Sequence, residues 1–172
     1  MRIGAKLLSA ALLTLMLPSL VLAYQNEPQG FRNLPWGSSS RLLGDKIFYD
    51  KIRTPGGTIT YYEREGDLMK MGGAKLLSVA YGYWLDNLSD VIVRTKGKEN
   101  WEALREAAVA RWGTPRQPDK GKELYFWDGN TTVIVLTYDE KTAIGTLHLR
   151  SVDMIRARAV YQKKGLGRIP EF

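Results

Sequence analysis

The sequence predicts an α+β domain made of two helix–three-strand units, with helices packed on antiparallel sheet, followed by a C-terminal helix. Two observations favour this class. Short segments rich in β-branched and aromatic residues alternate with Gly, Asn and Asp turns, which is typical of antiparallel strands. One stretch between them, residues 100–113, instead repeats its apolar residues at the spacing of a helix. The chain has no cysteine and can form no disulfide, but it is long enough to bury a hydrophobic core.

The first 23 residues have the composition of a secretory signal peptide. Arg2 and Lys6 precede 17 uncharged residues, 7–23, which end with a small residue at Ala23. A transmembrane anchor is the alternative, but a span needs about 20 apolar residues, and Pro18 breaks the helix. We therefore expect cleavage after Ala23, a periplasmic or secreted protein, and no transmembrane span after processing.

The charge distribution indicates the class of partner. The chain carries 25 basic and 18 acidic residues, and removal of Arg2 and Lys6 leaves a net charge of +5. Most of this excess lies after residue 149, so the body of the domain is almost neutral. Basic proteins often bind nucleic acid, but export argues against that partner. We expect an envelope protein or an anionic polymer instead, while the oligomeric state stays open.

The first unit follows a polar leader at residues 24–30, and a single folded domain is expected over residues 31–164. Serines 38–40 can cap a short helix that ends at Gly44, because a serine hydroxyl accepts an otherwise unpaired backbone N–H. Residues 45–57 end in Pro-Gly-Gly and predict a loop. Period-two spacing then predicts three strands, at residues 58–64, 75–84 and 88–96.

The second unit begins with the helix at residues 100–113, for which Asn100 is the expected N-cap and Gly113 the stop. Hairpin signals predict three further strands, at residues 123–128, 131–138 and 143–151. Ser151 is expected to cap the final helix, and a flexible tail is expected at residues 165–172. The pattern leaves open whether the two units share one sheet.

Three stretches resemble a family of exported bacterial proteins. They are FRNLPWGSS at residues 31–39, GGAKLLSVAYGYW at residues 72–84 and TKGKENWEALREAAVARWGTP at residues 95–115. Their shared features are an F-R-x-x-x-W-G-x-S start followed by turn glycines and core aromatic residues. The resemblance implies export, and it brings no activity, ligand or functional residue to this chain.

Side chains suited to catalysis are scarce. His148 is the only histidine, and it shares one face of its strand with Thr146 and Arg150. No motif supplies a nucleophile or an orienting acid, and no cysteine is present to complete a metal site. We therefore predict an ordinary surface histidine, no catalytic residue, no metal ligand and no cofactor.

Paired carboxylates can hydrolyse a glycosidic bond without histidine. The candidate carboxylates are Glu63, Glu65, Asp67, Asp86, Asp90, Asp128, Asp139 and Glu140. Most of them fall in turns or at strand ends, where acids are common for structural reasons. A carboxylate-based hydrolase of cell-wall or polysaccharide substrates is therefore the alternative function.

Aromatic residues and the basic C-terminal segment are the features that favour binding. Adjacent aromatic residues on a strand point to opposite faces, and exposed aromatic patches mark binding surfaces. Alternatively, the rings form the core and the cations solvate a helix. The candidate binding residues are Tyr81, Tyr83, Trp127, Arg156, Arg158, Lys163 and Lys164. The function predicted first is an exported envelope binding or interaction domain without catalysis, its ligand unspecified.

Overall fold

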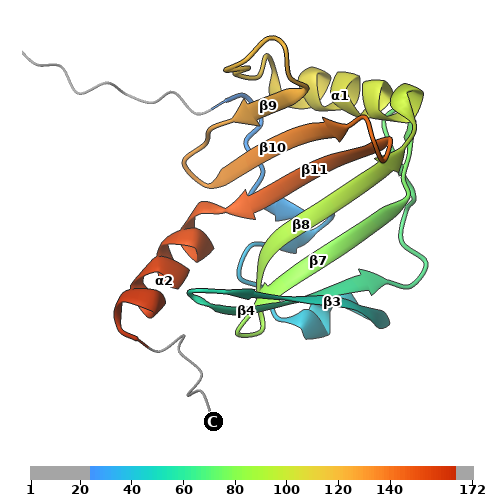
Figure 1. Cartoon of the computed structure of the whole chain (residues 1–172). Helices are drawn as coiled ribbons and strands as arrows, with labels where there is room; N and C mark the ends of the chain where they lie inside the picture. The colour runs from blue at the N-terminus through green and yellow to red at the C-terminus, as the bar shows by residue number, and fades with distance from the viewer. Residues whose placement is uncertain (1–23, 166–172) are drawn as a thin grey trace, which may run out of the picture.

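A computed structural model describes residues 24–165, and it shows a mainly β fold (Figure 1). Seven strands form one antiparallel sheet in the order β3-β4-β7-β8-β11-β10-β9. Two α-helices accompany the sheet within the described residues. The prediction of an α+β domain with two helix–three-strand units is therefore wrong. The expected signal peptide at residues 1–23 and the tail after Gly165 lie outside the described residues.

Both halves of the chain contribute to this one sheet, because β8 pairs with β11. Its strands are β3 (Lys46–Thr54), β4 (Gly57–Arg64), β7 (Ser78–Trp84), β8 (Asn87–Lys96), β9 (Leu124–Trp127), β10 (Thr132–Asp139) and β11 (Ile144–Ser151). Two small hairpins pair β1 (Gly30–Phe31) with β2 (Leu34–Pro35) and β5 (Lys70–Met71) with β6 (Ala74–Lys75). The helices are the 3₁₀-helix η1 (Ser40–Leu43), α1 (Lys98–Trp112) and α2 (Val152–Lys163).

The short helix predicted to follow a serine cap and to end at Gly44 is confirmed, whereas the loop predicted at residues 45–57 is wrong. The helix is η1, whose N-cap Ser39 accepts a hydrogen bond from the Arg41 N–H. Residues Lys46–Thr54 form strand β3, and a turn at Pro55 and Gly56 joins it to β4. The Pro-Gly-Gly sequence that predicts a loop forms only this turn and the start of β4. The charged side chains of β3 lie at an exposed edge of the sheet, where charge is compatible with a strand.

The elements of the second half are largely confirmed. β9, β10 and β11 are antiparallel neighbours, as the hairpin signals predict. α1 ends at Gly113 as expected, but its N-cap is Gly97, and Asn100 lies inside the first turn. The Ser151 hydroxyl caps α2, since it accepts from the Met154 N–H at 3.3 Å.

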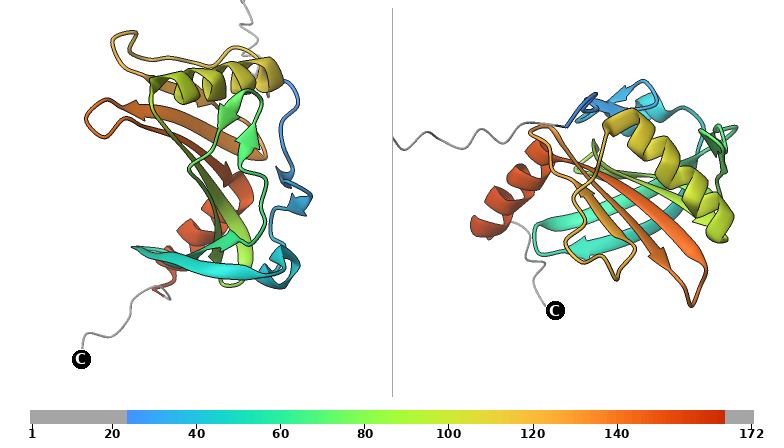
Figure 2. Two further views of the ribbon diagram at one scale, coloured as in Figure 1. Left: turned by 90° about the vertical axis from the view of Figure 1, so that its right-hand side faces the viewer. Right: turned by 90° about the horizontal axis from the view of Figure 1, so that it is seen from above.

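The two faces of the sheet are covered by different elements, and α1 and α2 lie at opposite ends of the molecule (Figure 2). Val91 and Val93 of β8 belong to the larger core cluster, which α1 covers. Ile92 points to the opposite face and belongs to a smaller cluster with residues of α2. We name these the α1 face and the α2 face. No residue of α2 is fully buried, so α2 covers its face less completely than α1 does.

The polar leader is part of the fold, within an N-terminal arm of residues 24–37 that packs against the α1-face core. Glu27 Oε1 accepts from the Thr132 N–H at 2.7 Å. The Thr132 hydroxyl donates to the Pro28 carbonyl at 2.5 Å and accepts from Trp36 Nε1 at 2.7 Å. Thr132 is fully buried, so these bonds join the arm to β10 at an interior position.

Candidate functional site

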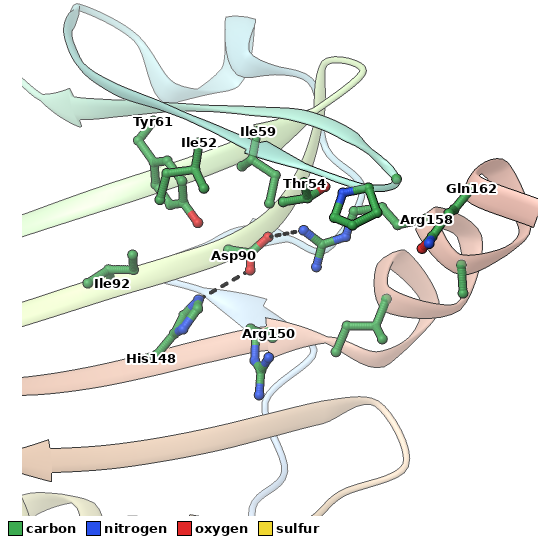
Figure 3. Close-up of a pocket in the computed structure, with 14 residues that line it drawn as sticks. Ile52, Thr54, Ile59, Tyr61, Asp90, Ile92, His148, Arg150, Arg158 and Gln162 are labelled. Atoms are coloured by element: carbon green, nitrogen blue, oxygen red, sulfur yellow. Dashed lines mark hydrogen bonds and ion pairs between the residues drawn. The ribbon is translucent and has the colours of Figure 1, made fainter. Parts of the chain in front are cut away.

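A pocket of about 550 Å³ lies on the α2 face, between α2 and the sheet (Figure 3). The β3–β4 hairpin, β8, β11 and α2 all contribute to its lining. Its apolar wall consists of Ile52, Ile59, Ile92 and Ile155. Its polar side chains include Tyr61, Asp90, His148, Arg150, Arg158 and Gln162. This α2 pocket therefore offers both apolar surface and ionic groups to a ligand.

Strand register sets three of these positions, Tyr61, Asp90 and Arg150, in one row across the sheet. Tyr61 on β4 lies opposite Gly82 on β7, and Gly82 lies opposite Asp90 on β8. Asp90 in turn lies opposite Arg150 on β11. Position 82 requires glycine, because a Cβ there would lie 2.6 Å from the Tyr61 ring. Side chains on one face of adjacent strands are close enough to interact, so the sheet itself assembles the site.

Asp90 is the centre of the ionic groups, although it is only 1% exposed. Its Oδ1 lies 3.2 Å from His148 Nε2, and its Oδ2 lies 3.5 Å from Arg158 Nη1 (Figure 3). The Ser89 hydroxyl donates to Oδ2. A buried carboxylate requires such partners, because an unpaired charge in the interior is strongly destabilising. Arg158 belongs to α2, so the ion pair also attaches this helix to the sheet.

Two groups in the pocket have shifted pKa values. Burial acts to raise the pKa of Asp90, but hydrogen bonds from His148 and Ser89 and the charge of Arg158 outweigh it and hold that pKa below its ordinary value. Burial raises the pKa of Tyr61, and the negative charge of Asp90 adds to this effect. At neutral pH the pocket therefore contains an ionised carboxylate and a neutral phenol that can donate a hydrogen bond.

The lining of the pocket has an excess of positive charge. Arg150 and Arg158 each carry a positive charge, and Asp90 is the one carboxylate among the lining residues. Arg150 Nε is buried and has no hydrogen-bond partner within residues 24–165. Arginine donors form strong, charge-assisted bonds with carboxylates and phosphates. An anion is therefore the ligand class that complements this pocket.

The three aromatic residues expected on a binding face lie elsewhere. Tyr81, Tyr83 and Trp127 are 3% exposed or less and belong to the core of the α1 face. The prediction that they form an exposed binding face is therefore corrected, and the alternative, that they are core residues, describes them. That face is covered by the N-terminal arm as well as by α1, and only the first part of this arm, residues 24–30, reads as a polar leader in the sequence.

Of the four candidate cations on α2, only Arg158 lines the pocket. Arg156 is exposed and lies 3.6 Å from Asp153 on the outer surface of the helix. Lys163 and Lys164 are exposed at the C-terminal end of α2. The four cations therefore do not form one surface, because a helix turns successive side chains in different directions.

Sequence reasoning misses the pairing of Asp90 with His148 and the position of Tyr61. One signal was present, since Asp90 is the only charged residue between Asn87 and Val93. A second was the placement of His148 and Arg150 on the same strand face. The sequence does not reveal that β8 pairs with β11, and this pairing brings together residues 58 positions apart.

The carboxylates considered for hydrolysis are not gathered in the α2 pocket. Within the described residues Asp90 alone of the eight lines it. Asp67 instead pairs with Arg32 at 2.6 Å, and Asp128 pairs with Arg116 at 2.8 Å. Residues 24–165 also contain no group of three or more His, Asp or Glu side chains suited to hold a metal ion.

Comparison with protein-family models, with curated proteins and with solved structures finds no match. In the part of the chain that the structure describes, no helix combines the length and the apolar character needed to cross a bilayer. The α2 pocket, with its charges and its apolar wall, is therefore the feature from which a function can be inferred.

Proposed function

We propose that the protein is an exported binding domain of the bacterial envelope that holds an anionic ligand in the α2 pocket. The observation that carries this proposal is the excess of positive charge from Arg150 and Arg158 beside a wall of isoleucines. Export is supported by the composition of residues 1–23. The resemblance of three sequence stretches to exported bacterial proteins supports it as well.

The arrangement favours an amphipathic anion. The acidic group, a carboxylate or a phosphate, would accept hydrogen bonds from Arg150 and from the neutral Tyr61 hydroxyl. The aliphatic part of the ligand would lie against the isoleucine wall, because binding sites combine apolar surface with a few polar groups that fix orientation. Asp90 holds Arg158 and His148 in position and leaves Arg150 to the ligand.

Replacement of Arg150 by glutamine tests this role. Decanoate and decyl phosphate are the probes, and isothermal titration calorimetry measures their binding to the purified protein. A hydrogen bond to a charged group is worth about 1.5–3 kcal/mol. The Arg150→Gln substitution is therefore expected to lower the affinity for the preferred anion at least about tenfold. The relative affinities of the two probes distinguish a carboxylate ligand from a phosphate ligand.

The matched control is Lys163→Gln, which removes a positive charge from an exposed position on α2 outside the pocket. It is expected to leave the affinity unchanged. Decylamine, with the same aliphatic chain and a positive head group, is expected not to bind. Equal binding of decylamine and decanoate, or an unchanged affinity in Arg150→Gln, contradicts an anion site.

Export is tested by the mass of the protein from the producing cells. We expect the intact mass to correspond to a chain that begins at Tyr24, because the small residue Ala23 ends the apolar stretch immediately before it, as is typical of a signal-peptidase site. The protein is expected in the periplasmic fraction or the medium. A mass that still includes residues 1–23 would refute the processing step, and it would leave the measurement on Arg150 unaffected.

A further inference from the structure

Strand β3 forms an open edge of the sheet. It pairs with β4 on one side, and within residues 24–165 no strand pairs with its other side. It is nine residues long, and each of them except Thr54 is exposed. At the other edge, β9 has only four residues and is bridged by Arg116 opposite Phe126. A long unpaired edge presents backbone groups with which another strand can pair.

Large apolar side chains make this edge a candidate for binding. Four of them on β3 are between 40% and 58% exposed, namely Ile47, Phe48, Tyr49 and Ile52. Contiguous exposed apolar residues of this size are uncommon on a surface that has no partner. Ile52 also lines the α2 pocket, so the edge lies beside that pocket.

The backbone of β3 has donors that face away from β4. The Lys51 N–H donates to the Asp50 carboxylate of the same strand at 2.7 Å, so it lies outside the β3–β4 ladder. In an antiparallel ladder this orientation alternates, and Arg53, two residues further on, presents its N–H to the same side. An added strand would supply carbonyl groups to both donors and would displace the Asp50 side chain.

A second copy of this chain fits the edge poorly. In the antiparallel registers centred on Lys51, Ile52 and Asp50, the outward residue Lys51 would face Lys51, Arg53 and Tyr49 of the other copy, respectively. The first two arrangements oppose like charges directly, and the third places Asp50 opposite Asp50, which is also repulsive. The register of β3 on β4 also shifts between Phe48 and Asp50, and such a bulge hinders the pairing of identical edges.

We propose that β3 binds an extended acidic segment of a partner protein, which adds an eighth strand to the sheet. Lys51 and Arg53 point to the same side of the strand, so acidic residues two positions apart on the segment would face them. The residue between those acids would be apolar and would face Ile52. Strand addition of this kind obtains affinity from main-chain hydrogen bonds and specificity from alternate side chains. The proposal is independent of the anion in the α2 pocket.

The test uses the purified protein and a labelled hexapeptide, acetyl-Thr-Glu-Val-Glu-Val-Thr-amide, followed by fluorescence anisotropy. The double variant Lys51→Glu/Arg53→Glu is expected to weaken binding about tenfold, since two exposed ion pairs are replaced by repulsion. Lys75→Glu/Lys141→Glu, which makes the same charge change at exposed positions away from β3, is expected to leave binding unchanged. In NMR, the peptide is expected to slow amide exchange at Lys51 and Arg53.

A second peptide separates strand pairing from simple charge attraction. It carries N-methyl groups on both glutamate nitrogens, so it keeps its charge and loses the backbone donors that would face β3. We expect it not to bind. Equal binding of the two peptides, no binding of either peptide, or a dimer in sedimentation that Lys51→Glu/Arg53→Glu abolishes would each overturn the proposal. None of these results affects the Arg150→Gln measurement.

Discussion

Replacement of Asp90 by asparagine is expected to lower the free energy of unfolding by about 2–4 kcal/mol. Asparagine keeps one oxygen for His148 but places an amide against Arg158 and the Ser89 hydroxyl, where a carboxylate oxygen accepts in the native protein. Arg158, whose side chain is only 14% exposed, then loses its ion-pair partner. Urea denaturation followed by tryptophan fluorescence measures the change, and hydrogen exchange is expected to show faster opening of α2.

The matched control is Asp153→Asn on the outer surface of α2. Asp153 lies 3.6 Å from Arg156, and both side chains are at least 70% exposed. Exposed ion pairs of this kind are worth at most about 1 kcal/mol, so the control is expected to change stability little. If Asp90→Asn has no larger effect than Asp153→Asn, the Asp90 ion pair does not hold α2 to the sheet.

The contribution of Asp90 is also expected to depend on pH. Because its pKa in the folded protein lies below the ordinary value of about 3.9, the ionised group stabilises the fold at pH values above that ordinary value. This stabilisation is lost as the pH falls through the lower pKa of the folded protein. The difference in stability between the native chain and Asp90→Asn is therefore expected to be constant above about pH 5 and to shrink below about pH 4. If the difference in stability between the two proteins stays constant down to about pH 2, the stability does not depend on the ionisation of Asp90 as its lowered pKa requires.

Replacement of Thr132 by valine is expected to lower the free energy of unfolding by about 2–4 kcal/mol. The two side chains have nearly the same shape, so the change removes the hydroxyl that joins Pro28 and Trp36. It leaves the Trp36 Nε1–H and the Pro28 carbonyl without that partner, and each buried unpaired group costs about 1–3 kcal/mol. Urea denaturation measures the loss, and faster hydrogen exchange is expected in the arm at residues 24–37.

Thr137→Val is the matched control for this substitution. Thr137 lies on the same strand, β10, but its side chain is partly exposed. Loss of its hydroxyl therefore leaves no buried polar group without a hydrogen-bond partner. We expect a change of less than about 0.5 kcal/mol. Equal effects at the two positions would show that the arm is not fixed by the Thr132 hydroxyl.

Most strands and both α-helices are visible in the sequence because their signals are local. The apolar stripe of α1, the stop at Gly113 and the cap at Ser151 each depend on residues within a few positions of one another. Strand β3 escapes prediction because Pro-Gly-Gly at residues 55–57 indicates a loop, whereas these residues form the hairpin turn and the start of β4. The fold class is wrong because the missed strand β3 and the pairing of β8 with β11 give one seven-stranded sheet in place of two helix–three-strand units.

The site divides in the same way. Sequence spacing places His148 and Arg150 on one strand face, and it identifies Arg158 as a candidate binding residue. It cannot show that Asp90, on a strand 58 residues away from His148, lies opposite Arg150. Nor can it show that Tyr81, Tyr83 and Trp127 are covered, because this depends on how the arm and α1, distant in the chain, pack on the sheet.

The sequence by itself therefore determined the hairpins, the N-cap of α2, the central helix and the lack of any disulfide, because each depends on the local chain or on composition. Only the tertiary structure decided that both halves form one sheet, that the aromatic residues are core, and that Tyr61, Asp90, His148, Arg150 and Arg158 line one pocket. Backbone hydrogen bonds between strands join residues that are distant in the chain. Every residue except proline offers the same backbone donor and acceptor, whatever its side chain, so these groups do not select one pairing over another. The strand pairing is selected by the burial of apolar side chains over the whole sheet, and no local sequence pattern predicts that burial.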